Sequence, residues 1–397
     1  MALAVTNAEG EKTLQLEMPV RSWIELSEDR LAKNFRVLLD RAGSGTHVLA
    51  VVKANAYGHG EEPCSVALAQ AGATWFGVAD VREGAAVRRA LAAAGQPMAE
   101  ILVLCGLLPE EISAIPEHRL SAVVWTPDQV TALRSAPGSK VHVEIETGMG
   151  RQGVRPGAEL DQLLDAISDA GLVFAGLMTH FCSAEVVGSA RTRQQQTEFE
   201  CAVQQVHARG LRPHWVHAGA SSTLNDPDWD PSWLSQLAES LNAQPMVRCG
   251  IALYGYCNPL QGGSPQIAPK LRPVMTWKTR VLDIREMLTG NCIGYDSTFV
   301  VTGPMRVALL PVGYADGLRR SLSSTNRREG GWVLIRDSRA PILGRISMNL
   351  TIVDVGAIED VASGDEVILL GDGIDADDHA RFAGTISYEI LCGIRKP

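Results

Sequence analysis

The sequence contains no long apolar run, no excess of basic residues and no paired-cysteine motif, and each absence excludes a class of protein. No stretch approaches the roughly eighteen uninterrupted apolar residues of a membrane-spanning helix, so we expect no membrane partner. The formal net charge of −9 argues against a nucleic-acid partner. The N-terminus lacks the basic start and apolar stretch of a secretory signal, so residues 1–19 are interpreted as a disordered extension and the protein as cytoplasmic.

The eight cysteines are scattered along the chain, at positions 64, 105, 182, 201, 249, 257, 292 and 392. They form no C-x-x-C pair and no Cys/His cluster with zinc spacing, which predicts reduced, buried thiols and no metal site. A hydrophobic fraction of 46% with 20% charged residues is ordinary for a soluble globular protein. At 397 residues the chain is long enough for two domains, or for one barrel with an appendage.

Apolar, strand-like runs alternate with helix-like segments over the first part of the chain. The runs are His47–Lys53, Trp75–Ala79, Ile101–Cys105, Ala122–Trp125, Val141–Glu146, Val173–His180, Trp215–Ala218 and Met246–Leu253. Segments such as Val81–Ala94 and Gln194–Gly210 carry apolar residues at helical spacing. Alternating units over roughly 230 residues fit a (β/α)8 barrel, which typically needs about 250, and we assign it to residues 27–258. Seven or nine strands fit equally well, because short apolar runs are ambiguous.

After about Pro259 the pattern changes to short strand-like runs with little helical periodicity. These runs are Val274–Ile284, Arg306–Pro311, Trp332–Arg336, Pro341–Met348 and Val367–Leu370. Glycine, aspartate and serine separate them, which predicts a second, mainly β domain over residues 259–397.

The segment Val51–Gly60 (VVKANAYGHG) is the most informative in the chain. An apolar run ends there in Lys53, and small residues, a tyrosine and two glycines follow. A lysine at the dry end of a buried strand must lose its proton or find a partner. A neutral amine is what a Schiff base with an aldehyde cofactor requires. We therefore interpret Lys53 as the cofactor lysine.

Other polar groups are expected at the same rim, because catalytic residues of such barrels lie at the carboxyl ends of the strands. The seventh run ends in Ala218–Ser222 and the eighth carries Arg248–Ile251, where phosphate groups bind in such barrels. Their glycines let the backbone approach a ligand closely. The fifth and sixth runs end at Thr147–Arg151 and Thr179–His180, so several candidate groups converge on one site.

The run Lys53–Gly60 resembles the pyridoxal-phosphate lysine motif of the alanine racemase family, and the resemblance extends from Ser22 to about Ile394. It implies a fold in which Ser22–Leu26 pairs into the second domain. It implies pyridoxal 5′-phosphate as cofactor and the interconversion of L- and D-alanine. It also implies a homodimer with shared active sites, in which the second domain of one subunit caps the barrel of the other.

The resemblance assigns roles to individual residues. Lys53 would hold the cofactor and act as one acid/base, and Tyr295, in Gly294–Phe299, would be the second. The cofactor phosphate would be bound by Tyr57, Ser221, Gly250, Ile251 and Tyr388, the pyridine nitrogen would face Arg248, and His180 would orient that arginine. The substrate would contact Arg151, Tyr314 and Met348.

Two bases match the chemistry of racemisation. The α-proton must leave one face and another must return to the opposite face, so Lys53 and Tyr295 would serve one face each. An arginine such as Arg248 cannot accept a proton from the pyridine nitrogen, so the ring would remain a weaker electron sink. Transamination would then be disfavoured.

The chain departs from the family pattern near the substrate carboxylate. Glu144 stands where the family commonly has a lysine that becomes carbamylated, and Glu146 replaces an aspartate. Ala220 replaces an asparagine before the phosphate-binding serine, and Asn349 replaces an aspartate after Met348. Glu144 supplies a carboxylate on a shorter stem, so Arg151 would be held differently.

Alternatives to an alanine racemase remain open at this point. One is a racemase for serine or for a broader range of amino acids, or a decarboxylase or lyase on the same scaffold. Another is a non-enzymatic pyridoxal-phosphate carrier, but a carrier would have no use for Tyr295, Met348 and Tyr388 in a second domain.

Overall fold

The computed structural model describes residues 2–6, 12–16 and 20–395. The chain divides into two compact units, one formed by Leu31–Ala56 and Gly60–Arg272 and the other by Met1–Arg30, Tyr57–His59 and Pro273–Pro397. In this division the first unit extends to Arg272. The connecting segment hydrogen-bonds to that unit, for example from the Arg272 amide to Asn34 Oδ1 at 3.0 Å.

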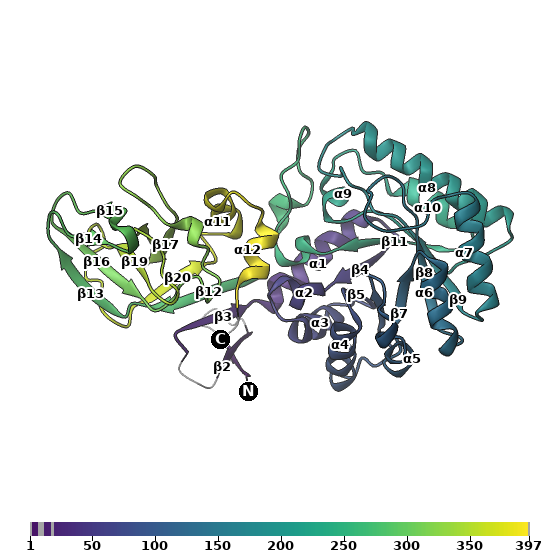
Figure 1. The fold of residues 1–397 in the computed structure, drawn as a ribbon, viewed down its shortest axis with the longest axis horizontal. Coiled ribbons are helices and arrows are strands. Elements are labelled where there is room, and N and C mark those ends of the chain that lie inside the picture. The colour runs from purple at the N-terminus through teal and green to yellow at the C-terminus, as the bar shows by residue number, and fades with distance from the viewer. Residues whose placement is uncertain (1, 7–11, 17–19, 396–397) are drawn as a thin grey trace. The chain divides into compact units, whose positions relative to one another are not determined.

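The first unit is a closed barrel of eight parallel strands, which confirms the predicted fold class (Figure 1). The strands are β4 (His47–Val51), β5 (Trp75–Val78), β6 (Glu100–Val103), β7 (Ser121–Val124), β8 (Lys140–Glu144), β9 (Val173–Met178), β10 (Trp215–His217) and β11 (Gln244–Cys249). Each matches one predicted run; all are shorter than predicted except β7, which has the same length and begins one residue earlier. Pairing of β11 with β4 closes the barrel, so Lys53 follows the strand next to Arg248.

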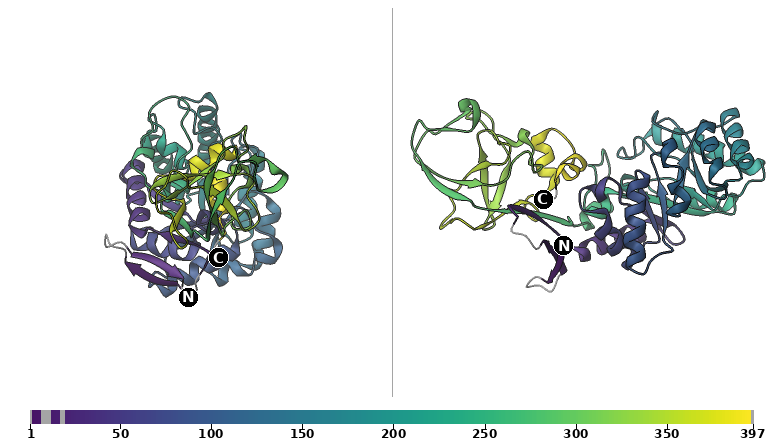
Figure 2. Two further views of the ribbon diagram at one scale, coloured as in Figure 1. Left: turned by 90° about the vertical axis from the view of Figure 1, so that its left-hand side faces the viewer. Right: turned by 60° about the horizontal axis from the view of Figure 1, so that its bottom comes forward.

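Helices surround this barrel (Figures 1 and 2). They are α1 (Glu28–Ala42), α3 (Glu61–Gln70), α4 (Val81–Ala93), α5 (Ala114–Glu117), α6 (Pro127–Ala132), α7 (Ala158–Asp169), α8 (Ala190–Ala208), α9 (Ser221–Asn225) and α10 (Pro231–Ser240). The first turn of α4 shows how side chains at a helix start hold the loop that follows a barrel strand, here β5. Asp80 caps the helix by accepting from the Glu83 amide, and Glu83 Oε2 accepts from the Ala79 amide at 2.8 Å. Such caps satisfy amides that lack a partner within the helix.

The second unit contains an antiparallel sheet in the order β13-β16-β19-β18-β17-β20-β12-β3. Its strands are β3 (Ser22–Leu26), β12 (Met275–Arg280), β13 (Asp283–Met287), β16 (Met305–Leu310), β17 (Trp332–Ile335), β18 (Ser338–Leu343), β19 (Thr351–Asp354) and β20 (Glu366–Leu370), and β14 (Cys292–Ile293) pairs with β15 (Phe299–Val300). The pairing of β3 with β12 confirms the expected placement of Ser22–Leu26. Two C-terminal helices, α11 (Ala376–Ala383) and α12 (Ser387–Gly393), complete the unit.

Within residues 1–19, Ala2–Thr6 and Lys12–Leu16 pair as antiparallel strands, and residues 1, 7–11 and 17–19 lie outside the described chain. Two expectations need correction. The run Pro341–Met348 does not continue as a strand beyond Leu343, because Gly344 has a φ of +64°. Of the cysteines, only Cys64 and Cys249 are buried, since the others lie on loops, on outer helix positions or, for Cys292, on the exposed side of the short strand β14.

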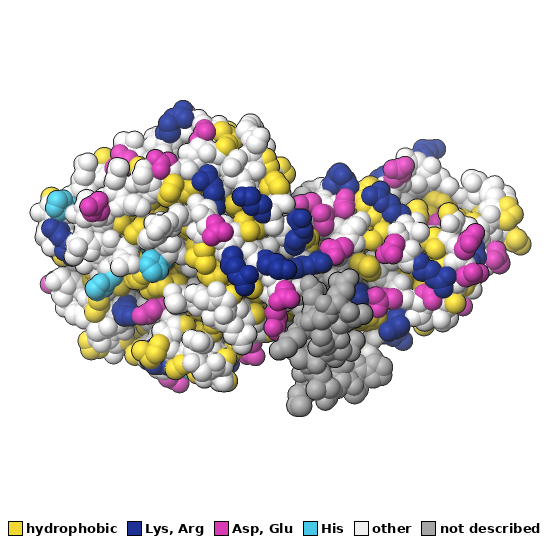
Figure 3. Space-filling model, turned by 180° about the vertical axis from the view of Figure 1, so that it is seen from behind, with side chains coloured by type: hydrophobic (Ala, Val, Ile, Leu, Met, Phe, Trp, Pro, Cys, Tyr) yellow, Lys and Arg dark blue, Asp and Glu magenta, His cyan; other side chains and the backbone are white. Residues whose placement is uncertain are grey.

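Over the described ranges, no helix is both long enough and apolar enough to span a bilayer. The same residues contain no group of three or more His, Cys, Asp or Glu side chains arranged to hold a metal ion. On the face drawn in Figure 3, acidic and basic side chains are both widely spread.

Candidate functional site

Lys53 lies at the carboxyl end of β4, where the chain makes an unusual turn. Residues 54–57 all have φ between 52° and 55°, so one left-handed turn follows the lysine directly. This conformation costs roughly 1–2 kcal/mol per residue, so the surrounding structure must hold it. The Ala56 amide donates to the Val52 carbonyl at 2.8 Å and the Asn55 amide to Glu83 Oε1 at 3.3 Å. These bonds fix the loop that presents Lys53.

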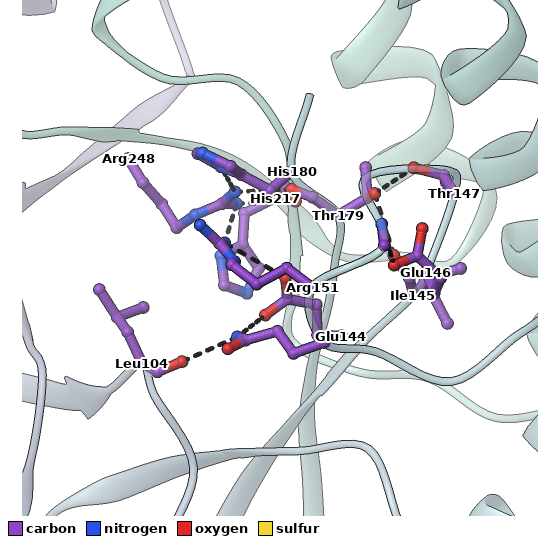
Figure 4. A network of polar contacts seen from close by, with 12 residues as sticks. Leu104, Glu144, Ile145, Glu146, Thr147, Arg151, Thr179, His180, His217 and Arg248 are labelled. Carbon is purple, nitrogen blue, oxygen red and sulfur yellow. Dashed lines mark hydrogen bonds and ion pairs between the residues drawn. The ribbon is translucent and has the colours of Figure 1, made fainter. Parts of the chain in front are cut away.

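Arg248, on β11, is buried and held by backbone carbonyls and histidines (Figure 4). Its guanidinium donates to the Thr179 carbonyl at 2.6 Å and to the His217 carbonyl at 3.1 Å. Burial lowers its pKa to about 10, with Glu144 acting in the opposite direction, so the group is charged at neutral pH. A fixed cation therefore lies inside the carboxyl-terminal rim.

Three neutral histidines surround this cation. Arg248 can only donate, so His180 Nδ1, 3.1 Å from its Nη2 atom, must accept. Burial, and secondarily Arg248, lowers the pKa of His180 to about 3. His217 and His142 lie deeper, 2.9 Å apart, and burial keeps the pKa of His217 well below its usual value and that of His142 at about 3. Gly176 makes room, because a Cβ there would lie 2.1 Å from His142 Nδ1.

The segments after β10 and β11 are joined at a buried serine. Ser221 Oγ accepts from the Gly250 amide at 3.2 Å and from the Ala252 amide at 3.3 Å. Ser221 opens α9 and Ile251 opens the short helix Ile251–Tyr254, so two first turns meet here. Ala220 offers no side-chain acceptor to the amides of α9. This set of amides and a hydroxyl fits a phosphate group, as loops after the last two strands of such barrels do.

Arg151 and Glu144 form an ion pair at the end of β8 (Figure 4). The Arg151 side chain is 48% exposed and that of Glu144 is 3% exposed, with 3.9 Å between Nη2 and Oε1. The side-chain amide of Gln152 donates both to Glu144 Oε2 and to the Leu104 carbonyl. The carboxylate of Glu144 is therefore held by Arg151 at one oxygen and by Gln152 at the other. Burial raises the pKa of Glu144, although Gln152, Arg248 and Arg151 oppose the change.

Tyr57 and Tyr388 lie together in the second unit, with ring centroids 5.9 Å apart. Tyr57 is buried and follows the left-handed turn after Lys53. The chain packs tightly beside it, since a Cβ on Gly58 would lie 2.3 Å from the Leu391 carbonyl oxygen in α12. Both tyrosines expected at the phosphate are thus brought next to each other.

Tyr295, Tyr314 and Met348 also belong to the second unit, and the segments that carry them converge. The Tyr314 amide donates to Ser347 at 3.1 Å and the Ala315 amide to Met348 at 2.9 Å. Asp296, next to Tyr295, pairs with Arg345 of the Met348 loop. The exposed fractions are 64% for Tyr295, 42% for Tyr314 and 54% for Met348. Three large side chains are therefore exposed on neighbouring segments of this unit.

Sequence reasoning missed several residues that shape the site. Gln152 is adjacent to Arg151 and gave no signal of its own, because a surface-type glutamine after a glycine-rich loop has no distinctive pattern. His142 could have been found, since it lies two residues before Glu144 on one strand and so on the same inward face. Thr179 contributes only its carbonyl to Arg248, which no side-chain motif encodes.

Comparison with known proteins decides the family. A family model described as the N-terminal domain of alanine racemase matches residues 26–258, and the model of the C-terminal domain matches residues 274–397. The chain belongs to the alanine racemase family. The resemblance drawn from Lys53–Gly60 is confirmed, and with it the assignment to isomerases that act on amino acids. Enzymes of this family depend on pyridoxal phosphate.

Relatives match the chain along nearly its whole length. The alanine racemase of Symbiobacterium thermophilum is 36% identical over 385 residues, covering 94% of this chain and 95% of that protein. The alanine racemase of Syntrophobacter fumaroxidans is 34% identical over 383 residues, with the same coverage of 94% and 95%.

Solved structures agree with the fold. The alanine racemase of Streptomyces coelicolor A3(2) superposes with a TM-score of 0.83 at 32% identity, covering 94% of this chain and 96% of that one. The alanine racemase of Bacillus anthracis, solved with bound L-Ala-P, gives a TM-score of 0.82 at 29% identity, with coverage of 96% and 94%.

Proposed function

We propose that this chain interconverts L- and D-alanine, with pyridoxal 5′-phosphate joined to Lys53. The observation that carries the proposal is the position of Lys53 at the carboxyl end of β4, beside the strand that bears Arg248 and leads to the Ser221–Gly250 phosphate cradle. Membership of the alanine racemase family supports alanine as the substrate. The donor set at α9 and at Ile251 fits the phosphate of this cofactor.

When bound, pyridoxal phosphate withdraws electrons from the α-carbon of an attached amino acid and makes its α-proton acidic. Lys53 would hold the cofactor and move a proton on one face of the substrate, and Tyr295 would move a proton on the other. Ser221, Gly250, Ile251, Tyr57 and Tyr388 would bind the phosphate. Arg248, oriented by His180, would face the pyridine nitrogen and cannot take its proton.

Substrate orientation would fall to the remaining site residues. Arg151 presents a guanidinium at the rim and would bind the substrate carboxylate in a charge-assisted contact. Met348 and Tyr314, on adjacent hydrogen-bonded segments, would limit the space around the side chain of the amino acid. A small pocket of this kind would exclude water and long side chains.

The direct test is chiral chromatography of amino acids after incubation with the purified enzyme. L-alanine should be converted to a racemic mixture, and L-serine, L-lysine and L-arginine should react much more slowly. Faster racemisation of serine than of alanine would identify serine, and not alanine, as the preferred substrate. No D-amino acid from any of the four, with cofactor present, would contradict the proposed activity.

We also propose a homodimer in which each site takes Lys53 from one subunit and Tyr295 from the other. The exposure of Tyr295, Tyr314 and Met348 supports this dimer. A tyrosine that faces only water cannot enclose a substrate, so a partner subunit would have to complete the site. Mixing inactive Lys53→Ala and Tyr295→Phe proteins should then restore activity. When equal amounts are combined, about half of the dimers contain one chain of each variant. Each of these dimers has one intact site out of two, so about a quarter of normal activity is expected.

The control for this experiment is either variant mixed with itself, which should stay inactive. Subunit exchange is verified with two differently tagged chains. Proven exchange without recovery of racemase activity would contradict sites built from two subunits.

Glu144→Gln should lower kcat/KM for alanine about ten- to a hundredfold, since it removes the charge that holds Arg151, a loss of roughly 1.5–3 kcal/mol. Because the pKa of Glu144 is raised, its carboxylate in the wild-type enzyme is protonated at a higher pH than an ordinary glutamate, and it then loses the negative charge that the variant also lacks. The difference between wild type and variant should therefore shrink at acidic pH. Bicarbonate should leave the wild-type rate unchanged, because the carboxylate is part of the chain.

The control is Glu100→Gln, which removes a surface carboxylate paired with Lys140 at the opposite end of the barrel strands. It should leave kcat/KM unaffected. A folded Glu144→Gln enzyme with normal kcat/KM would show that Glu144 is only a structural part of the barrel interior.

A further inference from the structure

Gln195 is a polar residue on the buried face of α8. Its side chain is fully buried, and the other buried residues of this helix are Phe199, Ala202, Val203 and Val206. A glutamine is seldom found at such a position, because burying an amide costs free energy unless its donors and acceptor are bonded. The partners of the Gln195 amide therefore indicate why a polar side chain lies there.

The Gln195 amide joins the ends of two neighbouring barrel strands. Its Nε2 atom donates to Thr147 Oγ1 at 3.1 Å, after β8, and to the His180 carbonyl at 2.9 Å, after β9. Its Oε1 atom accepts from the Cys182 amide at 2.9 Å. Both amide hydrogens and the carbonyl oxygen are thus used. One side chain of an outer helix connects the two loops that carry Arg151 and His180.

Two threonine hydroxyl groups extend this contact in one direction. Thr179 Oγ1 donates to the Ile145 carbonyl at 3.1 Å, so its single hydrogen is used. Thr147 Oγ1 lies 2.7 Å from Thr179 Oγ1 and must therefore donate that bond (Figure 4). Both threonines are buried. The donors run from Gln195 through Thr147 to Thr179, so the chain of hydrogen bonds has one arrangement.

Arg248 depends on the backbone that this chain holds. Its guanidinium donates to the Thr179 carbonyl at 2.6 Å and lies 3.1 Å from His180 Nδ1. Gln195 binds the backbone carbonyl of the same histidine. A shift of residues 179–182 would move both acceptors of Arg248, and the guanidinium would move with them.

The loop that leads to Arg151 is held by two sets of bonds. Gln195 binds Thr147 at its start. The Glu146 carboxylate accepts from the Gly148 amide and, at 2.8 Å, from the Gly150 amide. A fixed loop keeps the half-exposed Arg151 side chain near one position, which reduces the entropy lost when it binds a ligand.

We propose that Gln195 is a positioning residue, which holds Arg151 and Arg248 in a fixed arrangement relative to each other. It acts on the Arg151 loop through Thr147 and on Arg248 through the backbone at His180. The inference rests on the proposed function, because that function assigns the two arginines to the substrate carboxylate and to the pyridine nitrogen. A displacement of about 1 Å at such groups can cost about 10²-fold in rate.

Gln195→Met tests the proposal, since methionine is close to glutamine in size but forms none of the three bonds. We expect kcat/KM for alanine to fall about ten- to a hundredfold. The absorbance maximum of the bound cofactor should shift, because Arg248 would lie differently against the ring. Hydrogen exchange of the holoenzyme, followed by mass spectrometry, should become faster in residues 147–151 and 179–182 and stay unchanged in residues 51–60.

Gln205→Met is the matched control. Gln205 lies on the same helix, and its amide also forms two bonds to backbone, with the Gly157 N–H at 2.7 Å and the Gly157 carbonyl at 2.8 Å. Gly157 precedes α7 and has no contact with the chain of hydroxyl groups. The control should leave kcat/KM, the absorbance maximum and the exchange of residues 147–151 and 179–182 unchanged.

Thr147→Val tests the same chain without altering the buried face of α8, and it replaces Gln195→Met if that variant does not fold. It should lower kcat/KM about two- to tenfold, as expected for the loss of a single hydrogen bond. In the double variant the loss should be smaller than the product of the two single losses, because both substitutions break one chain.

A folded Gln195→Met protein with wild-type hydrogen exchange in residues 147–151 and 179–182 would overturn the proposal. Losses that multiply fully in the double variant would also contradict it, as would an equal loss of kcat/KM in Gln205→Met. The exchange measurement does not depend on racemisation. A wild-type holoenzyme that racemises no amino acid would therefore reject the proposed function, while hydrogen exchange would still decide the role of Gln195.

Discussion

Replacing Lys53 by alanine should abolish the yellow colour of the purified enzyme and reduce alanine racemisation by at least about a thousandfold. The substitution removes both the amine that would hold the cofactor and the base for one face of the substrate, and a positioned base alone contributes about 10²- to 10⁴-fold. The rate is measured with each enantiomer of alanine and saturating pyridoxal phosphate.

Lys140→Ala is the control, since Lys140 opens β8 at the opposite end of the barrel and pairs with Glu100 on the surface. It should remain coloured and active. Racemase activity within tenfold of wild type in Lys53→Ala would show that another amine fulfils the role assigned to Lys53.

Tyr295→Phe should slow racemisation in both directions by about 10²- to 10⁴-fold, because each direction needs both bases. Exchange of the α-proton with solvent should survive for one enantiomer, the one whose proton Lys53 removes, and disappear for the other. Proton NMR of L- and D-alanine in deuterated water measures the two exchange rates separately. This asymmetry distinguishes a lost base from a general loss of substrate binding.

The same variant should fold normally. Tyr295 is 64% exposed, so removal of its hydroxyl should leave the thermal unfolding temperature unchanged. Equal loss of exchange for both enantiomers in a normally folded protein would argue against a separate base on each face.

The barrel was predictable because its parallel strands are buried on both sides and appear in the sequence as continuous apolar runs. Each of the eight runs became a strand, although β4 ends at Val51 and the predicted run extended to Lys53. The second unit was harder. Its strands are short and half-exposed, so Thr351–Asp354 was missed and Val274–Ile284 proved to contain all of β12 and the first two residues of β13.

The site was predictable where single residues have a chemistry of their own. Lys53 and His180 follow strand ends and Arg248 lies in the last part of β11, and the barrel topology alone brings strand ends together. The left-handed turn after Lys53 was not predictable, because Ala54 and Ala56 favour right-handed helix, and the turn is held by bonds to distant groups, such as that of the Asn55 amide to Glu83. The contact between Gln152 and Glu144 also depends on three-dimensional placement.

The central claim is that Lys53 carries the cofactor, and reductive labelling tests it most directly. Borohydride reduction of the purified holoenzyme fixes the cofactor to its lysine, and peptide mapping by mass spectrometry then locates the modified residue. We predict one stoichiometric label, on Lys53. A label on a different lysine, or an enzyme that binds pyridoxal phosphate without any label, would contradict the proposed role of Lys53.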